Sequence, residues 1–159
     1  MRTPIAFVAL LAIAPVATLP TPTIVASDLD TGTAVLCRSA VEGVTLAYTH
    51  SMYGGEVREE FGAGAEGRLR RLAMTTANAA AAEYYAYDVG VERVGGRYRV
   101  DVPPREFAEV VVRVDRVGAH RLLAGERVVD LVATAGAGHR VALEVRAVPL
   151  AARLVPGAC

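Results

Sequence analysis

The sequence predicts an all-β protein, namely a small antiparallel β-sandwich or barrel of about eight strands with at most one short helix. Three observations support this fold class. Short segments alternate polar and apolar residues, glycine or proline breaks separate them, and a chain of 159 residues has no room for the several crossover helices of a parallel sheet. The length fits one domain.

Six segments have the alternation or the β-branched content of strands. Residues 97–102 are the clearest case, because polar and apolar side chains alternate along the whole segment. Turn signals such as Gly54-Gly55, Gly95-Gly96 and Pro103-Pro104 lie between the segments. The predicted strands are residues 44–50, 57–61, 97–102, 109–115, 127–132 and 140–148.

One segment has the composition of a helix. Four alanines follow Asn78, which is a favourable N-cap residue, and Glu83 ends the segment. The residues that follow, Tyr84-Tyr85-Ala86-Tyr87, favour a strand. We therefore expect a short turn of helix at residues 78–83 that covers one end of the sheet structure.

The N-terminus has the pattern of a secretory signal peptide. An uncharged apolar stretch follows Arg2, and small residues at Val25-Ala26-Ser27 precede Asp28. We predict a leader at residues 1–27 and a single all-β domain at residues 28–159, with an uncleaved anchor as the alternative. The domain is then extracytoplasmic, either secreted or attached to the cell envelope through its N-terminal segment alone.

Composition excludes several function classes. Seventeen basic and 17 acidic residues balance, so the total charge gives no reason to expect nucleic-acid binding. Every basic residue is arginine, which excludes mechanisms that need a lysine, such as a Schiff base or a phosphate-binding P-loop.

Two cysteines, Cys37 and Cys159, lie near opposite ends of the predicted domain. In an oxidising compartment they can form a single disulfide. The alternative is that Cys159, the last residue, is a free thiol on a mobile tail. The sequence leaves both outcomes open.

The most conspicuous candidate for chemistry is the dipeptide His50-Ser51. Neighbouring side chains of a regular strand point to opposite faces, so these two residues cannot act as a nucleophile and base on each other. A serine hydrolase would need His120 or His139 to approach Ser51 in space. Otherwise, both residues of the dipeptide form hydrogen bonds with the backbone at a strand end.

The sequence predicts no cofactor and no metal ion. The three histidines could combine with glutamates, but the chain has no compact ligand spacing such as His-x-His or Cys-x-x-Cys. The candidate ligands for a metal are His50, His120, His139, Glu56, Glu59 and Glu60.

Arginines and tyrosines form two further patterns. Arg68, Arg70 and Arg71 lie beside Glu66, while Arg97 and Arg99 share one strand face, and such groups can bind carboxylates or phosphates. Their more common role is to keep an exposed sheet edge soluble. Five tyrosines could line a pocket or serve as half-buried sheet residues; they are Tyr48, Tyr53, Tyr84, Tyr85 and Tyr87.

Two motifs suggest a family. The segment Leu46-Ala47-Tyr48-Thr49-His50-Ser51, followed by Val57-Arg58-Glu59-Glu60-Phe61, resembles small exported bacterial proteins of unknown function. Genes of that family commonly lie beside TRAP-type transporters of the TAXI subclass. Members have a hydrophobic strand that ends in His-Ser, then a glutamate and an aromatic residue, and His50, Ser51, Glu59 and Phe61 fit these positions. The resemblance covers residues 35–148, but residues 79–85 replace the Gly-rich, Pro-ended segment of many members.

The resemblance implies a context rather than a mechanism. We expect a non-enzymatic accessory protein that works with a solute transporter and binds its permease, its solute-binding protein or a small anionic solute. The expected contact residues are His50, Ser51, Tyr53, Glu59 and Phe61. Two alternatives are a small hydrolase or metal-binding protein that uses Ser51 and the histidines, and a structural module of the envelope.

Overall fold

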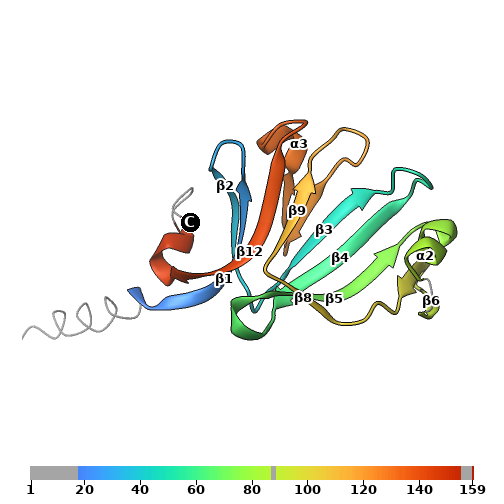
Figure 1. Ribbon diagram of the computed structural model, residues 1–159, viewed down its shortest axis with the longest axis horizontal. Helices are drawn as coiled ribbons and strands as arrows, with labels where there is room; N and C mark the ends of the chain where they lie inside the picture. The colour runs from blue at the N-terminus through green and yellow to red at the C-terminus, as the bar shows by residue number, and fades with distance from the viewer. Residues whose placement is uncertain (1–17, 87–88, 155–158) are drawn as a thin grey trace, which may run out of the picture.

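The computed structural model describes residues 18–86, 89–154 and 159, and it confirms the predicted all-β class, with two antiparallel sheets (Figure 1). Its elements in chain order are β1 (Pro20–Asp28), β2 (Ala34–Ser39), β3 (Val44–Thr49), β4 (Glu56–Ala63), η1 (Ala65–Gly67), β5 (Leu69–Thr76), α2 (Ala79–Ala86), β6 (Val91–Val94), β7 (Arg97–Val100), β8 (Arg105–Phe107), β9 (Glu109–Arg113), β10 (Arg121–Ala124), β11 (Arg127–Asp130), α3 (Leu131–Thr134), β12 (Arg140–Pro149) and η2 (Leu150–Leu154).

The smaller sheet has four strands in the order β2-β1-β12-β9. Strand β1 pairs along its whole length with β12, from Pro20 opposite Pro149 to Asp28 opposite Val141, and its other edge pairs with β2. The two ends of the chain are therefore joined at the centre of this sheet. All other strands of the fold come between β1 and β12 in the sequence.

The larger sheet has eight strands. Its main order is β11-β10-β3-β4-β5-β7-β6, and β8 pairs with the part of β5 that β7 leaves uncovered. A β-bulge lies where β4 meets β5: Glu60 pairs with Ala73, but Phe61 pairs with Arg71 and so Leu72 is left over. Because of this extra residue, Arg71 lies on the same face of the sheet as Phe61.

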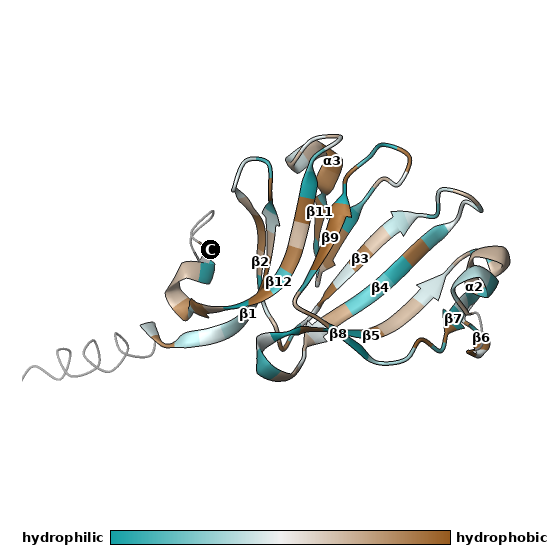
Figure 2. Cartoon of the chain, viewed as in Figure 1, coloured by the Kyte–Doolittle hydropathy of each residue, from teal (hydrophilic) through white to brown (hydrophobic). Residues whose placement is uncertain are grey.

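The hydrophobic core has two parts. The main part lies between the sheets and includes Ile24, Leu46, Phe61 and Leu143. A smaller part lies beneath α2 and is built around Val57 and Met74. Hydrophobic and hydrophilic bands alternate along β4 and β12 (Figure 2), as expected for strands with one face on a core.

Strand β1 changes the prediction for the start of the domain. The expected boundary between Ser27 and Asp28 falls inside this strand, whose residues Ile24, Val25 and Ala26 are completely buried. In this structure, residues 20–27 are therefore part of the same sheet as the predicted domain from Asp28. Residues 1–17 lie outside the described residues, and none of the helices that the structure describes is long and apolar enough to span a bilayer.

Helix α2 confirms the predicted cap and extends further than expected. The side chain of Asn78 accepts hydrogen bonds from the Ala80 and Ala81 backbone amides at 2.8 and 3.3 Å. The helix continues to Ala86, so the prediction that Tyr84 and Tyr85 belong to a strand was wrong. Their rings pack edge to face over the end of the larger sheet, and this tertiary packing outweighs the local propensity.

A second predicted segment is shorter than expected. Strand β11 ends at Asp130, and Leu131 and Val132 belong to the short helix α3 instead of the strand. Asp130 is the N-cap of that helix, because its side chain accepts a hydrogen bond from the Ala133 amide at 2.9 Å. A β-branched run thus ends where an aspartate can cap a helix.

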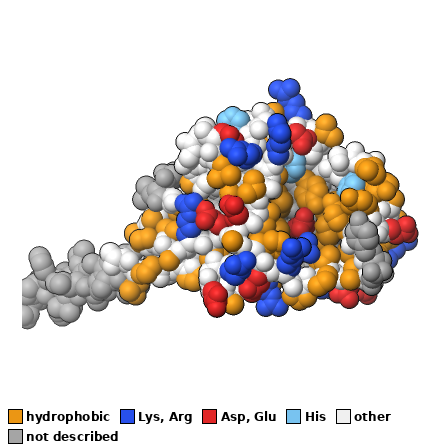
Figure 3. Space-filling view, viewed as in Figure 1, with side chains coloured by type: hydrophobic (Ala, Val, Ile, Leu, Met, Phe, Trp, Pro, Cys, Tyr) orange, Lys and Arg blue, Asp and Glu red, His pale blue; other side chains and the backbone are white. Residues whose placement is uncertain are grey.

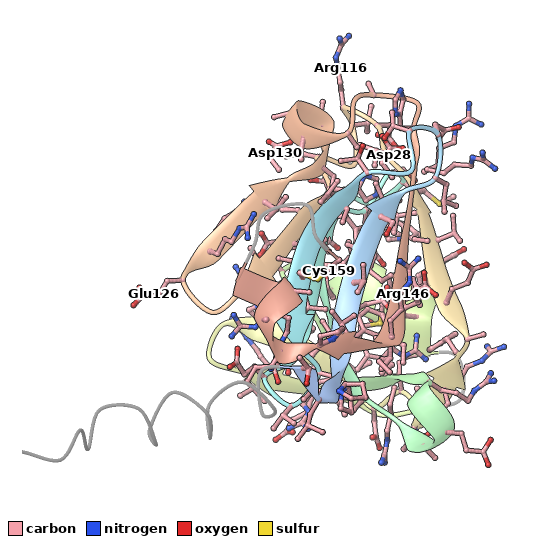
Figure 4. All side chains as sticks on the ribbon, turned by 90° about the vertical axis from the view of Figure 1, so that its left-hand side faces the viewer. Asp28, Arg116, Glu126, Asp130, Arg146 and Cys159 are labelled. Carbon is pink, nitrogen blue, oxygen red and sulfur yellow. A yellow bond between two sulfur atoms is a disulfide. The ribbon has the colours of Figure 1, made fainter. Side chains whose placement is uncertain are left out.

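The structure joins the two cysteines. Cys37 in β2 and Cys159 form a disulfide, with their Cα atoms 6.3 Å apart, which lies within the usual range for such a bond. Figure 4 labels Cys159, which lies in front of the N-terminal strands in that view. The sequence left open whether Cys159 is a free thiol or pairs with Cys37, and in the structure the two cysteines are paired.

Candidate functional site

The candidate site is a hollow beyond the end of β3, between the β3–β4 turn, helix α2 and the loop from β9 to β10. Its volume is about 370 Å³. Figure 3 shows hydrophobic side chains gathered around a depression on this side of the molecule. Most of its lining is aromatic or polar, and the lining residues are Tyr48, Thr49, His50, Ser51, Met52, Tyr84, Tyr85, Asp115, Gly118 and His120. We call it the tyrosine-histidine pocket.

His50 is held rigidly by the turn that follows it. Its Nδ1 atom accepts hydrogen bonds from the backbone amides of Met52 and Tyr53, each at 3.2 Å. Because Nδ1 accepts, the ring is neutral and its proton is on Nε2. The rings of Tyr53, Tyr84 and Tyr85 surround the imidazole, with centroids 5.2 to 5.5 Å away. His50 is only 7% exposed. It stabilises the turn through its hydrogen bonds and also lines the pocket.

A chain of hydrogen bonds runs from the pocket into the protein. The Tyr48 hydroxyl lies 2.9 Å from Oε1 of Glu59 and 3.0 Å from the Tyr85 hydroxyl. A carboxylate can only accept, so Tyr48 donates to Glu59 and Tyr85 donates to Tyr48. Burial and the neighbouring Glu59 charge raise the pKa of Tyr48 far above its ordinary value, so it stays protonated.

The bulge in β5 completes this network. It turns Arg71 to the inner face, where its Nη1 atom lies 3.4 Å from Oε2 of Glu59. Both side chains are mostly buried, with exposures of 19% and 16%. Arg71 therefore balances the charge of Glu59 from the side opposite to the tyrosines.

His120 forms the far wall of the pocket. Its ring stacks on Tyr48, with centroids 5.8 Å apart and planes 25° apart. Burial lowers the pKa of His120, and the nearby Asp115 opposes this shift only in part. The ring is therefore neutral at pH 7. Its Nδ1 atom is buried and has no hydrogen-bond partner among the described residues.

The loop before His120 fixes that ring. Asp115 accepts a hydrogen bond from the Gly118 amide at 2.6 Å, which lowers the pKa of the carboxyl group. A Cβ atom at Gly118 would lie 2.3 Å from Cε1 of His120, so any other residue there would displace the His120 ring. Ala119 has φ of 45°, a left-handed conformation that is uncommon for a residue other than glycine. Backbone strain of this kind is often found at functional sites.

The pocket brings Ser51 into the same lining as His120 and Asp115, and the hydrogen bonds of a catalytic relay are not formed among the described residues. Strand β3 ends at Thr49, so the opposite-face argument for His50 and Ser51 does not apply. Even so, no hydrogen bond connects the Ser51 hydroxyl with a histidine within the described part of the chain, and Nδ1 of His120 has no partner there. A serine hydrolase mechanism would have to form both contacts when a substrate binds.

The third histidine lies elsewhere. Nδ1 of His139 is 2.9 Å from Oδ2 of Asp28, at the end of β1 that Figure 4 labels. Burial alone would raise the pKa of Asp28, but the hydrogen bonds from His139, the Asp30 amide and Thr31 lower it to about 2. The same contact raises the pKa of His139.

Asp28, Asp30 and His139 could offer ligand atoms to one metal ion, since these atoms all lie within 4.8 Å of one another. Their oxygens already have other partners, however. Asp28 binds its own loop and His139, while Asp30 accepts from the Arg140 backbone amide and guanidinium. These hydrogen bonds therefore connect the end of β1 with the start of β12.

The other predicted residues have different environments. Tyr53 packs against His50, and Glu59 lies behind Tyr48, so neither is at the centre of the pocket surface. Phe61 is only 2% exposed and contacts Phe107 in the main core. Phe61 therefore stabilises the sheets and cannot contact a partner, contrary to the expectation from its motif.

The arginine patterns mostly serve the protein itself. Arg97 lies on the outer face of the larger sheet, where it shares the Glu56 carboxylate with Arg58 and Arg121. Burial would raise the pKa of Glu56, but the three guanidinium groups lower it. Of the arginines that the structure describes, none lines the tyrosine-histidine pocket.

Sequence reasoning missed Asp115 as a pocket residue and did not pair His120 with Tyr48. The spacing of Asp115 and Gly118 is a turn signal that could have drawn attention to this loop. The stacking of His120 on Tyr48 joins strands that the sequence alone does not place side by side.

Comparisons of the chain with models of protein families, with curated proteins and with solved structures found no match. Its function must therefore be inferred from the chemistry of its own residues and from the sequence resemblance.

Proposed function

We propose that this chain is an exported, non-enzymatic binding protein that holds a small solute in the tyrosine-histidine pocket and assists a TRAP-type transporter of the TAXI subclass. The main observation is the pocket itself, with a volume of about 370 Å³ and walls of tyrosine and histidine. Ligand sites commonly have this size and an aromatic lining with a few fixed polar groups.

Preorganisation supports binding rather than turnover. Hydrogen bonds hold His50 and Tyr48, and His120 stacks on Tyr48 and packs closely against Gly118. Rigid walls of this kind reduce the entropy that a protein loses when a ligand binds. The missing contacts between Ser51 and the histidines of the described residues argue in the same direction.

The binding part is tested by a thermal-shift screen of small solutes. A solute that binds the folded state raises the melting temperature. We expect the shift to be lost in Tyr84→Ala, which removes a half-exposed ring from the pocket, and kept in Glu83→Ala on the same helix. If no solute stabilises the protein, or if Tyr84→Ala responds like the wild type, the pocket is not a binding site.

The transporter part rests on the sequence resemblance and has its own test. Tagged protein is recovered from membranes of the source organism, and the TRAP permease and its solute-binding protein are identified by mass spectrometry. Recovery of either one with the wild type and Glu83→Ala, with less recovery for Tyr84→Ala, would support the role. Recovery of neither would contradict it without affecting the result of the solute screen.

A hydrolase is the second candidate, because Ser51, His120 and Asp115 line the same pocket. A fluorophosphonate probe labels serines that are activated by a base. We expect no labelling of Ser51, since its hydroxyl has no histidine contact. Labelling that disappears in both Ser51→Ala and His120→Ala would make the chain an enzyme.

A structural module of the envelope is the third candidate. It is favoured by the two hydrogen bonds that His50 Nδ1 accepts from backbone amides, because these stabilise the turn after β3. In that case His50→Ala would lower stability, and no pocket variant would alter binding to a solute or transporter. Solute binding that depends on Tyr84 would exclude this candidate.

A further inference from the structure

We infer that the tyrosine-histidine pocket takes a small organic cation, either a protonated amine or a quaternary ammonium group. This inference rests on the proposed binding function and names the class of ligand. It also differs from the sequence-based expectation of an anionic solute.

The first argument is charge. Among the described residues, Asp115 is the one that brings a formal charge to the pocket lining, and its carboxyl group, whose pKa the Gly118 amide lowers, is ionised at pH 7. His50 Nδ1 accepts two amide hydrogen bonds and so carries no proton, and burial lowers the pKa of His120. The chain has no lysine, and no arginine in the described ranges lines the pocket. An anion would therefore meet a negative site without a compensating cation, whereas a cation would be attracted.

The second argument is the direction of the hydrogen bonds. Tyr85 donates its only hydroxyl proton to Tyr48, which in turn donates to Glu59. The Tyr85 oxygen is then left with lone pairs and no proton for a ligand. One Asp115 oxygen accepts from Gly118, and its second oxygen can accept from a ligand. The Tyr85 and Asp115 oxygens thus offer acceptors to an N–H group of a ligand.

The third argument is the aromatic lining. Tyr48, Tyr84 and Tyr85 all border the hollow, and Tyr84 is 44% exposed. Tyrosine rings attract cations through their negative π faces, most strongly where water is partly excluded. Met52 at the rim adds a polarisable, adaptable side chain. These groups suit a cation with an apolar surface better than a strongly hydrated ion.

The test compares choline with 3,3-dimethylbutan-1-ol, which has the same shape but no charge. The chain has no tryptophan, so titration calorimetry or tyrosine fluorescence measures binding. We expect choline to bind at least about tenfold more tightly than the neutral alcohol, as a partly desolvated cation–π contact requires. Propylamine at pH 7 serves as the protonated amine.

Two variants separate the role of the charge from folding. Asp115→Asn keeps an oxygen that can accept from Gly118 and removes the charge, and we expect choline affinity to fall about three- to fivefold. Glu126→Gln makes the same change of charge at a residue that projects from the β10–β11 turn (Figure 4) and is not part of the pocket lining, and it should leave affinity unchanged. Tyr84→Ala should reduce choline affinity about tenfold.

Several results would overturn the inference. Equal affinity for choline and the neutral alcohol would show that the pocket recognises shape alone. Failure of both choline and propylamine to bind the folded protein would exclude the cation class. Binding of benzoate that is lost in Tyr84→Ala would also refute the inference, while the proposed binding function would stand. If Tyr84→Ala changes neither solute nor transporter binding, the proposed function itself fails.

Discussion

The position of strand β1 gives the sharpest prediction. A chain that begins at Asp28 lacks eight of the nine residues of β1, the strand between β12 and β2. We expect this truncated chain to lose cooperative folding, whereas a chain that begins at Pro20 keeps it. The first form corresponds to the leader boundary that the sequence predicts, and the second to the boundary that the structure requires.

The magnitude follows from burial. Ile24 and Val25 are completely buried, and burying one such side chain contributes about 1.5–3 kcal/mol. Together they contribute about 3–6 kcal/mol, against a total stability of about 5–15 kcal/mol for a typical domain. The loss also leaves β2 without a partner strand and exposes the backbone edge of β12, which promotes aggregation.

Urea unfolding monitored by far-UV circular dichroism compares the two forms directly. N-terminal sequencing of the exported protein then shows which form the cell produces. A chain from Asp28 that unfolds cooperatively at the same urea midpoint as the chain from Pro20 would refute the reasoning. A mature N-terminus at Asp28 on a folded, exported protein would refute it as well.

Three further predictions concern hydrogen-bonded residues. Tyr48→Phe should lower the free energy of unfolding by about 1–2 kcal/mol, because Glu59 loses a charge-assisted hydrogen bond; a urea midpoint equal to that of the wild type would contradict this. The Asp28–His139 pair should stabilise the protein most between about pH 4 and 6.5. Below pH 3.8 its contribution should fall as Asp28, with a pKa of about 2, becomes protonated, and above pH 6.5 it should fall as His139, with a raised pKa, loses its proton. Asp28→Asn should flatten this part of the pH profile of the melting temperature, and an unchanged profile would contradict the pairing. Asn78→Ala should cost about 1 kcal/mol through loss of the α2 cap, as measured by thermal unfolding against Glu83→Ala, and equal stability of the two variants would count against the cap.

Local features of the fold could be predicted, because their causes lie within a few residues. Alternation and turn glycines place β3, β4, β7, β9 and β12 close to their observed bounds. Asn78 marks the start of α2 for an equally local reason, since its side chain binds amides two and three residues away. Asp130 shows the limit of this reasoning. The β-branched residues around it predict a strand that continues to Val132, whereas Asp130 caps the helix α3.

The site could be predicted only in part. His50, Ser51 and the tyrosines attract attention in the sequence, and the structure does gather most of them at one pocket. Phe61 shares their motif but lies in the core. Residues on the same face of a strand can differ in burial, and the motif does not show that Phe107 packs against Phe61. Asp115 and His120 come from a loop far along the chain, and no local pattern relates them to Tyr48.

The sequence by itself determined the all-β class, the main strands and the capped helix, since periodicity and capping act between near neighbours. Only the tertiary structure decided that residues 20–28 form a central strand, because that strand begins with two prolines and gains its stability from partners at the other end of the chain. The bulge that turns Arg71 toward Glu59 and the stacking of His120 on Tyr48 also depend on the register between distant strands. Long-range pairing thus created the pocket from residue types that the sequence only suggested.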